Sequence, residues 1–238
     1  MSEKEMSFVE HLGELRKALI ISLVSIGITS GVCFYFYEKI LYILTCQIKN
    51  IEFIFVSPGE AFISSLQASV IFGFFLSLPI VLREIFWFIS PGLTSYERKI
   101  SIPTIIGSYF LFLIGITFAY FILLPVGVKF LINFAPINIK PMISIGRYIS
   151  FASMLILGTA IIFELPLVLL FLSLLGIVNT EFLKKNRKYA LFISFLIGAI
   201  ITPSVDIFTQ SLLAGVIILL YELSIFLVWI STRGKNKI

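Results

Sequence analysis

Six long runs of apolar residues, separated by short polar segments, dominate the pattern along the chain. Each run has too few polar positions for a surface helix in water, and lipid offers the backbone no water to bond, so each run must be helical. The pattern predicts an all-α integral membrane protein with six transmembrane helices, at about 18–37, 61–82, 103–128, 148–174, 189–201 and 211–230. The loops are short, so residues 1–238 are expected to form a single membrane-embedded domain.

The end of the chain departs from this regularity. The fifth run, Tyr189 to Ile201, covers only about 20 Å at about 1.5 Å per residue, against a hydrocarbon core of about 30 Å. We therefore expect short fifth and sixth helices, with a thinned bilayer around them or a 202–208 turn that lies below the headgroups. A re-entrant hairpin is the alternative.

The basic residues are distributed unevenly between the two sets of loops. Of 18 Lys and Arg, 13 fall on the side of the N-terminus, and five fall on the other side: Lys39, Lys49, Lys129, Lys140 and Arg147. Because positive residues favour the cytoplasmic side, both termini are predicted to be cytoplasmic. This distribution also accounts for the net charge of +5, so no nucleic-acid partner is expected.

Several polar residues lie within or beside the apolar runs. Glu164 has about ten apolar or small residues on either side, and a carboxylate at that depth costs at least a few kcal/mol unless it is protonated or paired. It is expected either to face a partner helix, substrate or cavity, or to be protonated and bonded within its own bundle. Glu222 could snorkel, cap a helix or have a function. Thr202 and Gln210 could contact another transmembrane helix or simply satisfy their turn.

The N-terminal rim has a short amphipathic stretch at about 7–17, in which Glu10, Glu14 and Lys17 lie at near-helical spacing. This stretch is expected to lie along the membrane interface before the chain turns inward. The loop around 83–99 carries Glu97 and Arg98 on the same side of the membrane, among aromatic residues typical of a membrane boundary. Such loops often hold charges without a function, but two carboxylates on one basic rim suggest a site. His11 is expected to be a rim residue rather than a proton shuttle.

Six ordered motifs resemble one known family. They are HLGELRK (11–17), SPGEAF (57–62), FWFISPGLTSYERK (86–99), FELP (163–166), ITPSVDIFTQ (201–210) and YELSI (221–225). Together they resemble TatC, the multispanning subunit of the twin-arginine protein translocase, over residues 7 to 230. The resemblance implies a receptor subunit that binds twin-arginine signal peptides of folded proteins at the cytoplasmic face of the membrane. It also implies self-association, TatA- and TatB-type single-span partners and transport driven by the proton gradient.

Residue by residue, the resemblance places the signal-peptide site at Glu14 and Glu97, with Arg16, Phe88 and Arg98 nearby. Carboxylates suit this role because each guanidinium fork donates two parallel hydrogen bonds and keeps its proton. For the partner helices, the resemblance implies a polar intramembrane set of Glu164, Thr202 and Gln210.

The main alternative is a small secondary transporter or channel with Glu164 as an intramembrane proton or cation site. The two halves of the chain show no internal correspondence, which weighs against that alternative. A membrane enzyme is not expected, because the chain has one histidine and no clustered ligands or nucleophile–base pair. We expect no cofactor and no metal. The expected location is a bacterial cytoplasmic membrane, or a thylakoid membrane if the source is a plastid.

Overall fold

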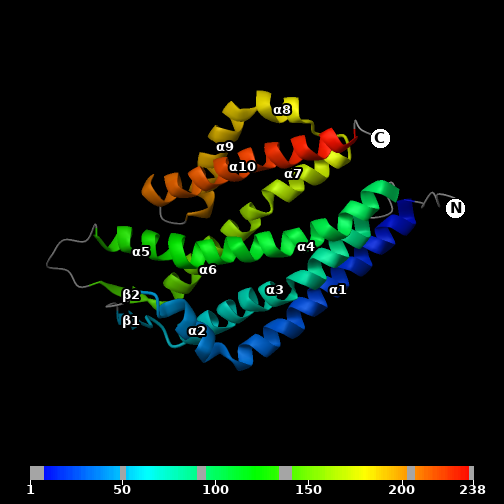
Figure 1. The fold of residues 1–238 in the computed structure, drawn as a ribbon. Helices are drawn as coiled ribbons and strands as arrows, with labels where there is room; N and C mark the ends of the chain where they lie inside the picture. The colour runs from blue at the N-terminus through cyan, green and yellow to red at the C-terminus, as the bar shows by residue number, and fades with distance from the viewer. Residues whose placement is uncertain (1–7, 49–51, 90–94, 134–140, 203–206, 236–238) are drawn as a thin grey trace. The chain divides into compact units, whose positions relative to one another are not determined.

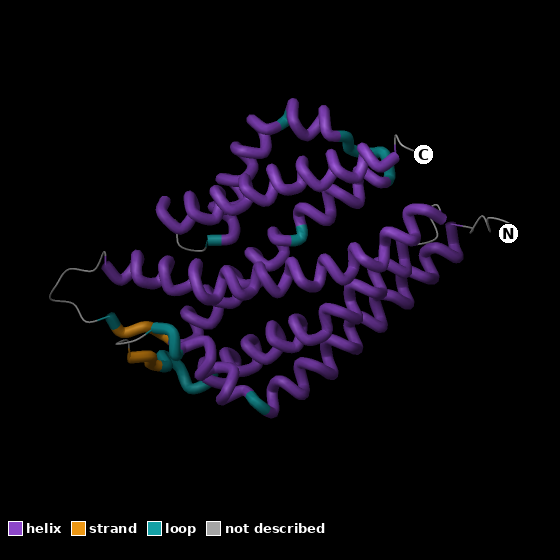
Figure 2. Tube along the Cα trace, in the orientation of Figure 1, coloured by secondary structure: helices purple, strands orange, loops and turns teal. Residues whose placement is uncertain are grey.

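The computed structural model describes residues 8–48, 52–89, 95–133, 141–202 and 207–235. Helices make up nearly all of this part, and two short strands lie beside each other (Figure 2). The elements, labelled in Figure 1, are α1 (Phe8–Tyr35), α2 (Tyr37–Thr45), β1 (Glu52–Ile54), α3 (Glu60–Ile89), α4 (Ser95–Phe118), the π-helical turn η2 (Ala119–Leu123), α5 (Leu124–Asn133), β2 (Met142–Ser144), α6 (Ile145–Phe163), α7 (Leu165–Leu174), α8 (Thr180–Lys185), α9 (Arg187–Ile201) and α10 (Ile207–Lys235).

Five segments of the described chain are long and apolar enough to cross a membrane. They are Val9–Tyr35, Glu60–Ile89, Pro103–Asn133, Ile145–Leu174 and Ile207–Ser231. The fifth predicted span corresponds to α9, whose 15 residues reach only about 22 Å. The prediction of a short fifth helix is therefore confirmed.

Two expectations about helix ends are wrong. The sixth helix is not short, because α10 has 29 residues and extends beyond the predicted 211–230 at both ends. The sequence beyond residue 230 is polar but contains no proline, so the helix continues past the apolar run. At the other end of the chain, α1 is continuous from Phe8, without the expected turn near residue 17. Residues 14–19 are strong helix formers, which makes a break there unfavourable.

By their contacts, residues of the chain form two compact units, Met1–Ile40 with Ser65–Tyr109 and Leu41–Ser64 with Phe110–Ile238. In the first unit, α1 and α3 run antiparallel and approach closely where the last third of α1 meets the middle of α3. The Thr29 hydroxyl donates a hydrogen bond to the Gly73 carbonyl at 2.7 Å. A Cβ on residue 73 would lie 2.5 Å from the Ser30 Cα, so glycine is required at this crossing.

In the second unit, α10 packs against α7 and α9. The α9–α10 crossing is close, because a Cβ at Gly198 would lie 3.1 Å from the Gln210 carbonyl oxygen.

The third and fourth predicted spans are not uniform α-helices. A π-helical turn precedes Pro125, and the fourth span is interrupted at Glu164, two residues before Pro166. These departures agree with the kinks that prolines produce when an N–H is missing.

One end of the second unit carries a cap built from α2 and the two strands. Strand β1 pairs in parallel with β2, with Phe53 opposite Ile143. The last carbonyls of α2 lack helical donors, and two tyrosines supply them: Tyr120 donates to the Ile43 carbonyl and Tyr148 to the Leu44 carbonyl. The cap thus ties α2 to the third and fourth spans.

Glu60, the first residue of α3, is the polar centre of this cap. One carboxylate oxygen accepts the Val56 and Ser57 N–H groups, at 2.6 and 3.3 Å. The other oxygen accepts the Gly146 N–H at 2.8 Å and the Ser144 hydroxyl. Four donors from two distant segments therefore converge on one side chain, which joins the start of α3 to the start of α6.

We predict that Glu60→Ala lowers the apparent Tm of the detergent-purified protein, because four donors lose their acceptor at once. Gly146→Ala should act in the same direction, since its Cβ would lie 2.8 Å from the Glu60 side chain. Glu52→Ala is the matched control, because it removes an exposed carboxylate of the neighbouring strand. Equal Tm values for Glu60→Ala and Glu52→Ala would contradict this account of the cap.

Candidate functional site

A small cluster forms where the start of α1 meets the end of α3 in the first unit (Figure 1). The His11 ring stacks on the Phe88 ring, with the centroids 4.4 Å apart and the planes at 15°. One turn further along α1, a Glu14 carboxylate oxygen lies 3.9 Å from His11 Nδ1. Residues three apart share a helix face, so the helical start of α1 presents His11 and Glu14 together. We call these three residues the rim cluster.

The two oxygens of Glu14 are not equivalent. The side chain as a whole is 40% exposed, yet its Oε2 is buried and has no hydrogen-bond partner within the described part of the chain. The contact to His11 Nδ1, at 3.9 Å, is too long for a hydrogen bond. A buried acceptor without a donor costs about 1–3 kcal/mol and more when it is charged. The rim cluster therefore contains an acceptor that an added donor would satisfy.

The other residues predicted for this site lie at the same end of the first unit. Arg16 is exposed, and it does not share the face of Glu14, because residues two apart on a helix diverge. Glu97 and Arg98 lie in the first turn of α4, which begins shortly after α3 ends. Their side chains lie outside the described part of the structure. The structure therefore brings Glu14 and Phe88 together through His11, a residue that we did not predict for this site.

Glu164 lies at the break between α6 and α7 and is partly buried. Its backbone N–H bonds the Ile161 carbonyl, three residues back, at 3.1 Å. Pro166, two residues further on, accounts for the break because its ring removes a backbone N–H donor. Where a helix is interrupted, backbone N–H and C=O groups lose their helical hydrogen-bond partners. A carboxylate at that position lies beside these groups.

Thr202 and Gln210 both bond the backbone of α9. The buried Thr202 hydroxyl donates to the Gly198 carbonyl at 2.8 Å, and Gln210 Nε2 donates to the Phe195 carbonyl at 3.0 Å. The Gly198 carbonyl also accepts the Thr202 N–H, so these side-chain bonds add to the helical ones. Both bonds are made within the α9–α10 hairpin, which agrees with one of the two roles expected for the pair. The structure does bring the two residues to one end of the α9–α10 hairpin, and their role toward a partner helix stays a prediction.

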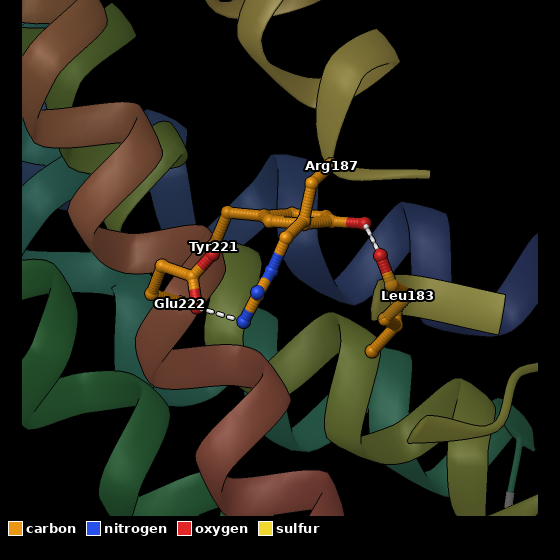
Figure 3. A network of polar contacts seen from close by, with 4 residues as sticks. All are labelled: Leu183, Arg187, Tyr221 and Glu222. Atoms are coloured by element: carbon orange, nitrogen blue, oxygen red, sulfur yellow. Dashed lines mark hydrogen bonds and ion pairs between the residues drawn. The ribbon is translucent and has the colours of Figure 1, made fainter. Parts of the chain in front are cut away.

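The opposite end of this hairpin holds a network that the sequence did not reveal (Figure 3). Arg187 Nη2 donates to Glu222 Oε2 at 2.7 Å, and the Tyr221 hydroxyl donates to the Leu183 carbonyl at 2.8 Å. Glu222 was expected to snorkel, cap a helix or have a function, but it forms an ion pair with the first residue of α9. The two residues are 35 positions apart, so no helical spacing could indicate the pair.

Comparison with known proteins identifies the family. Residues 10–215 match the family described as TatC, Sec-independent protein translocase protein. A protein of that name from Aquifex aeolicus is 41% identical, with 98% of this chain and 99% of the relative covered. The namesake from Desulforapulum autotrophicum is 40% identical, with 99% and 88% covered.

A solved structure supports the same conclusion. The crystal structure described as the twin-arginine translocase receptor TatC superposes with a TM-score of 0.82, at 41% identity, and covers 94% of this chain and 100% of that chain. Proteins of the same name occur in bacteria and in chloroplasts. The protein is thus a multi-pass membrane protein of a bacterial or thylakoid membrane with a role in protein transport, and the chain belongs to the TatC family of Sec-independent protein translocases.

Proposed function

We propose that this chain is the receptor subunit that binds twin-arginine signal peptides at the rim cluster, with Glu14 and Glu97 as the carboxylates that receive the two guanidinium groups. The observation that carries the proposal is the buried Glu14 Oε2 without a donor. A guanidinium supplies what is missing, because it donates several N–H bonds in one plane and remains charged.

The stacked rings add a second element of recognition. Guanidinium planes stack on aromatic faces, and His11 and Phe88 present such a surface directly beside Glu14. Lysine would gain less here, because an ammonium is a strongly hydrated point charge that cannot form two parallel bonds. Both side chains carry one positive charge, so the rim cluster favours arginine over lysine by geometry and by weaker hydration of the guanidinium. Only the family resemblance suggests Arg16 and Arg98 for this site, near the peptide.

The charge asymmetry of the loops supports a cytoplasmic location for this site. Thirteen of 18 basic residues share the predicted side of the N-terminus, so the rim cluster faces the compartment from which folded cargo departs. The apolar segment of a signal peptide could then enter lipid beside the cluster. Residues 1–238 would act as one membrane-embedded domain.

TatA- and TatB-type single-span proteins are the proposed partners, with self-association of this chain in the same complex. Glu164, Thr202 and Gln210 would form the polar set for partner helices, because carboxyl, hydroxyl and amide groups form hydrogen bonds across helices in lipid. Transport would draw on the proton gradient. The alternative of a small transporter centred on Glu164 is not retained, since the chain belongs to a family of protein translocases.

We predict that Glu14→Gln and Glu97→Gln each weaken binding of a twin-arginine signal peptide by about tenfold or more, because a charge-assisted hydrogen bond contributes about 1.5–3 kcal/mol. The measurement is fluorescence anisotropy of a labelled peptide with the detergent-purified protein. Glu181→Gln is the control, since Glu181 is exposed on α8 on the same predicted side of the membrane. Membrane insertion should not change, because acidic residues contribute little to orientation. Wild-type affinity in both variants would refute the site.

A second prediction separates the contact of His11 with Phe88 from its contact with Glu14. His11→Phe keeps an aromatic ring to stack on Phe88, whereas His11→Ala removes it. We expect His11→Phe to retain most of the wild-type peptide affinity and His11→Ala to lose several-fold, because an aromatic pair contributes about 0.5–1.5 kcal/mol beyond burial. The same anisotropy assay applies. If both variants bind alike, the stack on Phe88 has no part in recognition.

A further inference from the structure

An open apolar groove lies in the second unit, where α5 ends and α6 begins. Its volume is about 270 Å³. The apolar lining comes from both sides of the groove: Val128, Leu131 and Ile132 on α5, then Ile143, Tyr148 and Phe151 on β2 and α6. The hydroxyl of Tyr148 is already engaged, since it donates to the Leu44 carbonyl. The groove therefore offers apolar surface and little hydrogen bonding.

One charged residue, Arg147, completes the lining. Its side chain is exposed, and its guanidinium makes no ion pair within the described part of the chain. The neighbouring carboxylate that could have paired with it is Glu60, which bonds the Gly146 N–H next in sequence. Both oxygens of Glu60 accept hydrogen bonds from other groups, and Glu60 forms no ion pair with Arg147 among the described residues.

This arginine stands in an unfavourable position for two independent reasons. It is one of only five basic residues on the predicted extracytoplasmic side, where the charge bias of membrane proteins disfavours it. It also lies in the first turn of α6, with its N–H bonded to the Ser144 cap, and the positive end of a helix dipole repels a cation. An anion bound beside Arg147 would relieve both costs.

We propose that the groove binds an anionic phospholipid, with the lipid phosphate at the Arg147 guanidinium and part of one acyl chain between α5 and α6. The charge of Arg147 is complementary to that of the phosphate, and guanidinium groups hold phosphate oxygens in a bidentate geometry. The apolar walls match a hydrocarbon chain and not a free ion. The groove also lies at the end of two membrane spans. At that depth, the phosphate of a lipid lies on the headgroup side and its acyl chains extend into the hydrocarbon core.

The lipid would connect two parts of the cap. Ser144 and Gly146, beside Arg147, are held by Glu60, so a lipid at this point contacts the segment that joins the third and fourth spans to the start of α3. The site does not involve the rim cluster, and its existence does not depend on signal-peptide binding. A failed test of one proposal therefore leaves the other unaffected.

The test is native mass spectrometry of the full-length protein in detergent, titrated with phosphatidylglycerol or with phosphatidylethanolamine of the same acyl chains. We expect phosphatidylglycerol to bind at least about fivefold tighter, because one basic residue near an anionic lipid contributes about 1 kcal/mol. Arg147→Gln should abolish this preference, and Arg147→Lys should keep most of it. Lys39→Gln is the matched control, since it removes one exposed positive charge on the same predicted side of the membrane.

Two further measurements address the acyl chain. Glycerol 1-phosphate, an anionic glycerol phosphate without an acyl chain, should not displace phosphatidylglycerol at equal concentration. Leu131→Trp fills the groove and should weaken binding of both lipids, which keeps the test decisive if Arg147→Gln does not elute as a folded protein in size-exclusion chromatography. An unchanged lipid preference in folded Arg147→Gln, displacement by glycerol 1-phosphate, or unchanged binding by Leu131→Trp would each overturn the proposal.

Discussion

The hydrocarbon core of the bilayer offers no water to a polar group, and this constraint determines where the chemistry of the chain can lie. Backbone groups within the core must bond to each other, so the apolar segments are helices, and ionisable side chains concentrate at helix ends and interruptions. Glu60 begins α3 and has four donors, whereas Glu14 lies near the start of α1 with one oxygen that has none. The same constraint thus distinguishes the fully bonded carboxylate of Glu60 from that of Glu14, which we propose receives a ligand.

The absence of water in the hydrocarbon core also explains how the short helix of this chain is stabilised. The α9 helix cannot cross an undisturbed core, and its polar groups are satisfied within the α9–α10 hairpin, by Thr202 and Gln210 at one end and by Glu222 at the other. Close packing supports this arrangement, because Gly198 lets the α10 backbone approach. The hairpin is therefore held by side-chain bonds at both ends and by backbone proximity between them.

Much of the fold could be predicted, because hydropathy and charge bias are local properties of the sequence. The apolar runs located all five segments of the described chain that are long and apolar enough to cross a membrane, and the length of the fifth run indicated the short α9 helix. The end of α10 was missed because a polar continuation of a helix carries no apolar signal.

The pairing of Arg187 with Glu222 and the stacking of His11 on Phe88 were also missed, since both join residues far apart in sequence. His11 lies within the HLGELR motif, and that was the one available signal for its role. Glu60 likewise stood in a recognised motif, but its partners Ser144 and Gly146 come from a distant segment.

The central claim is that the unsatisfied carboxylate of Glu14 recognises an arginine guanidinium of the signal peptide. A double-mutant cycle tests this claim most directly, with a twin-arginine peptide and its Lys-Lys variant each titrated against the wild-type protein and Glu14→Gln. If Glu14 contacts the arginines, the two changes are coupled, and Glu14→Gln should lose most of the preference for arginine over lysine, with an interaction energy above about 0.5 kcal/mol. If the binding free energies lost through Glu14→Gln and through the Lys-Lys peptide instead add within about 0.3–0.5 kcal/mol, Glu14 does not contact the arginines. The account of the rim cluster is then wrong.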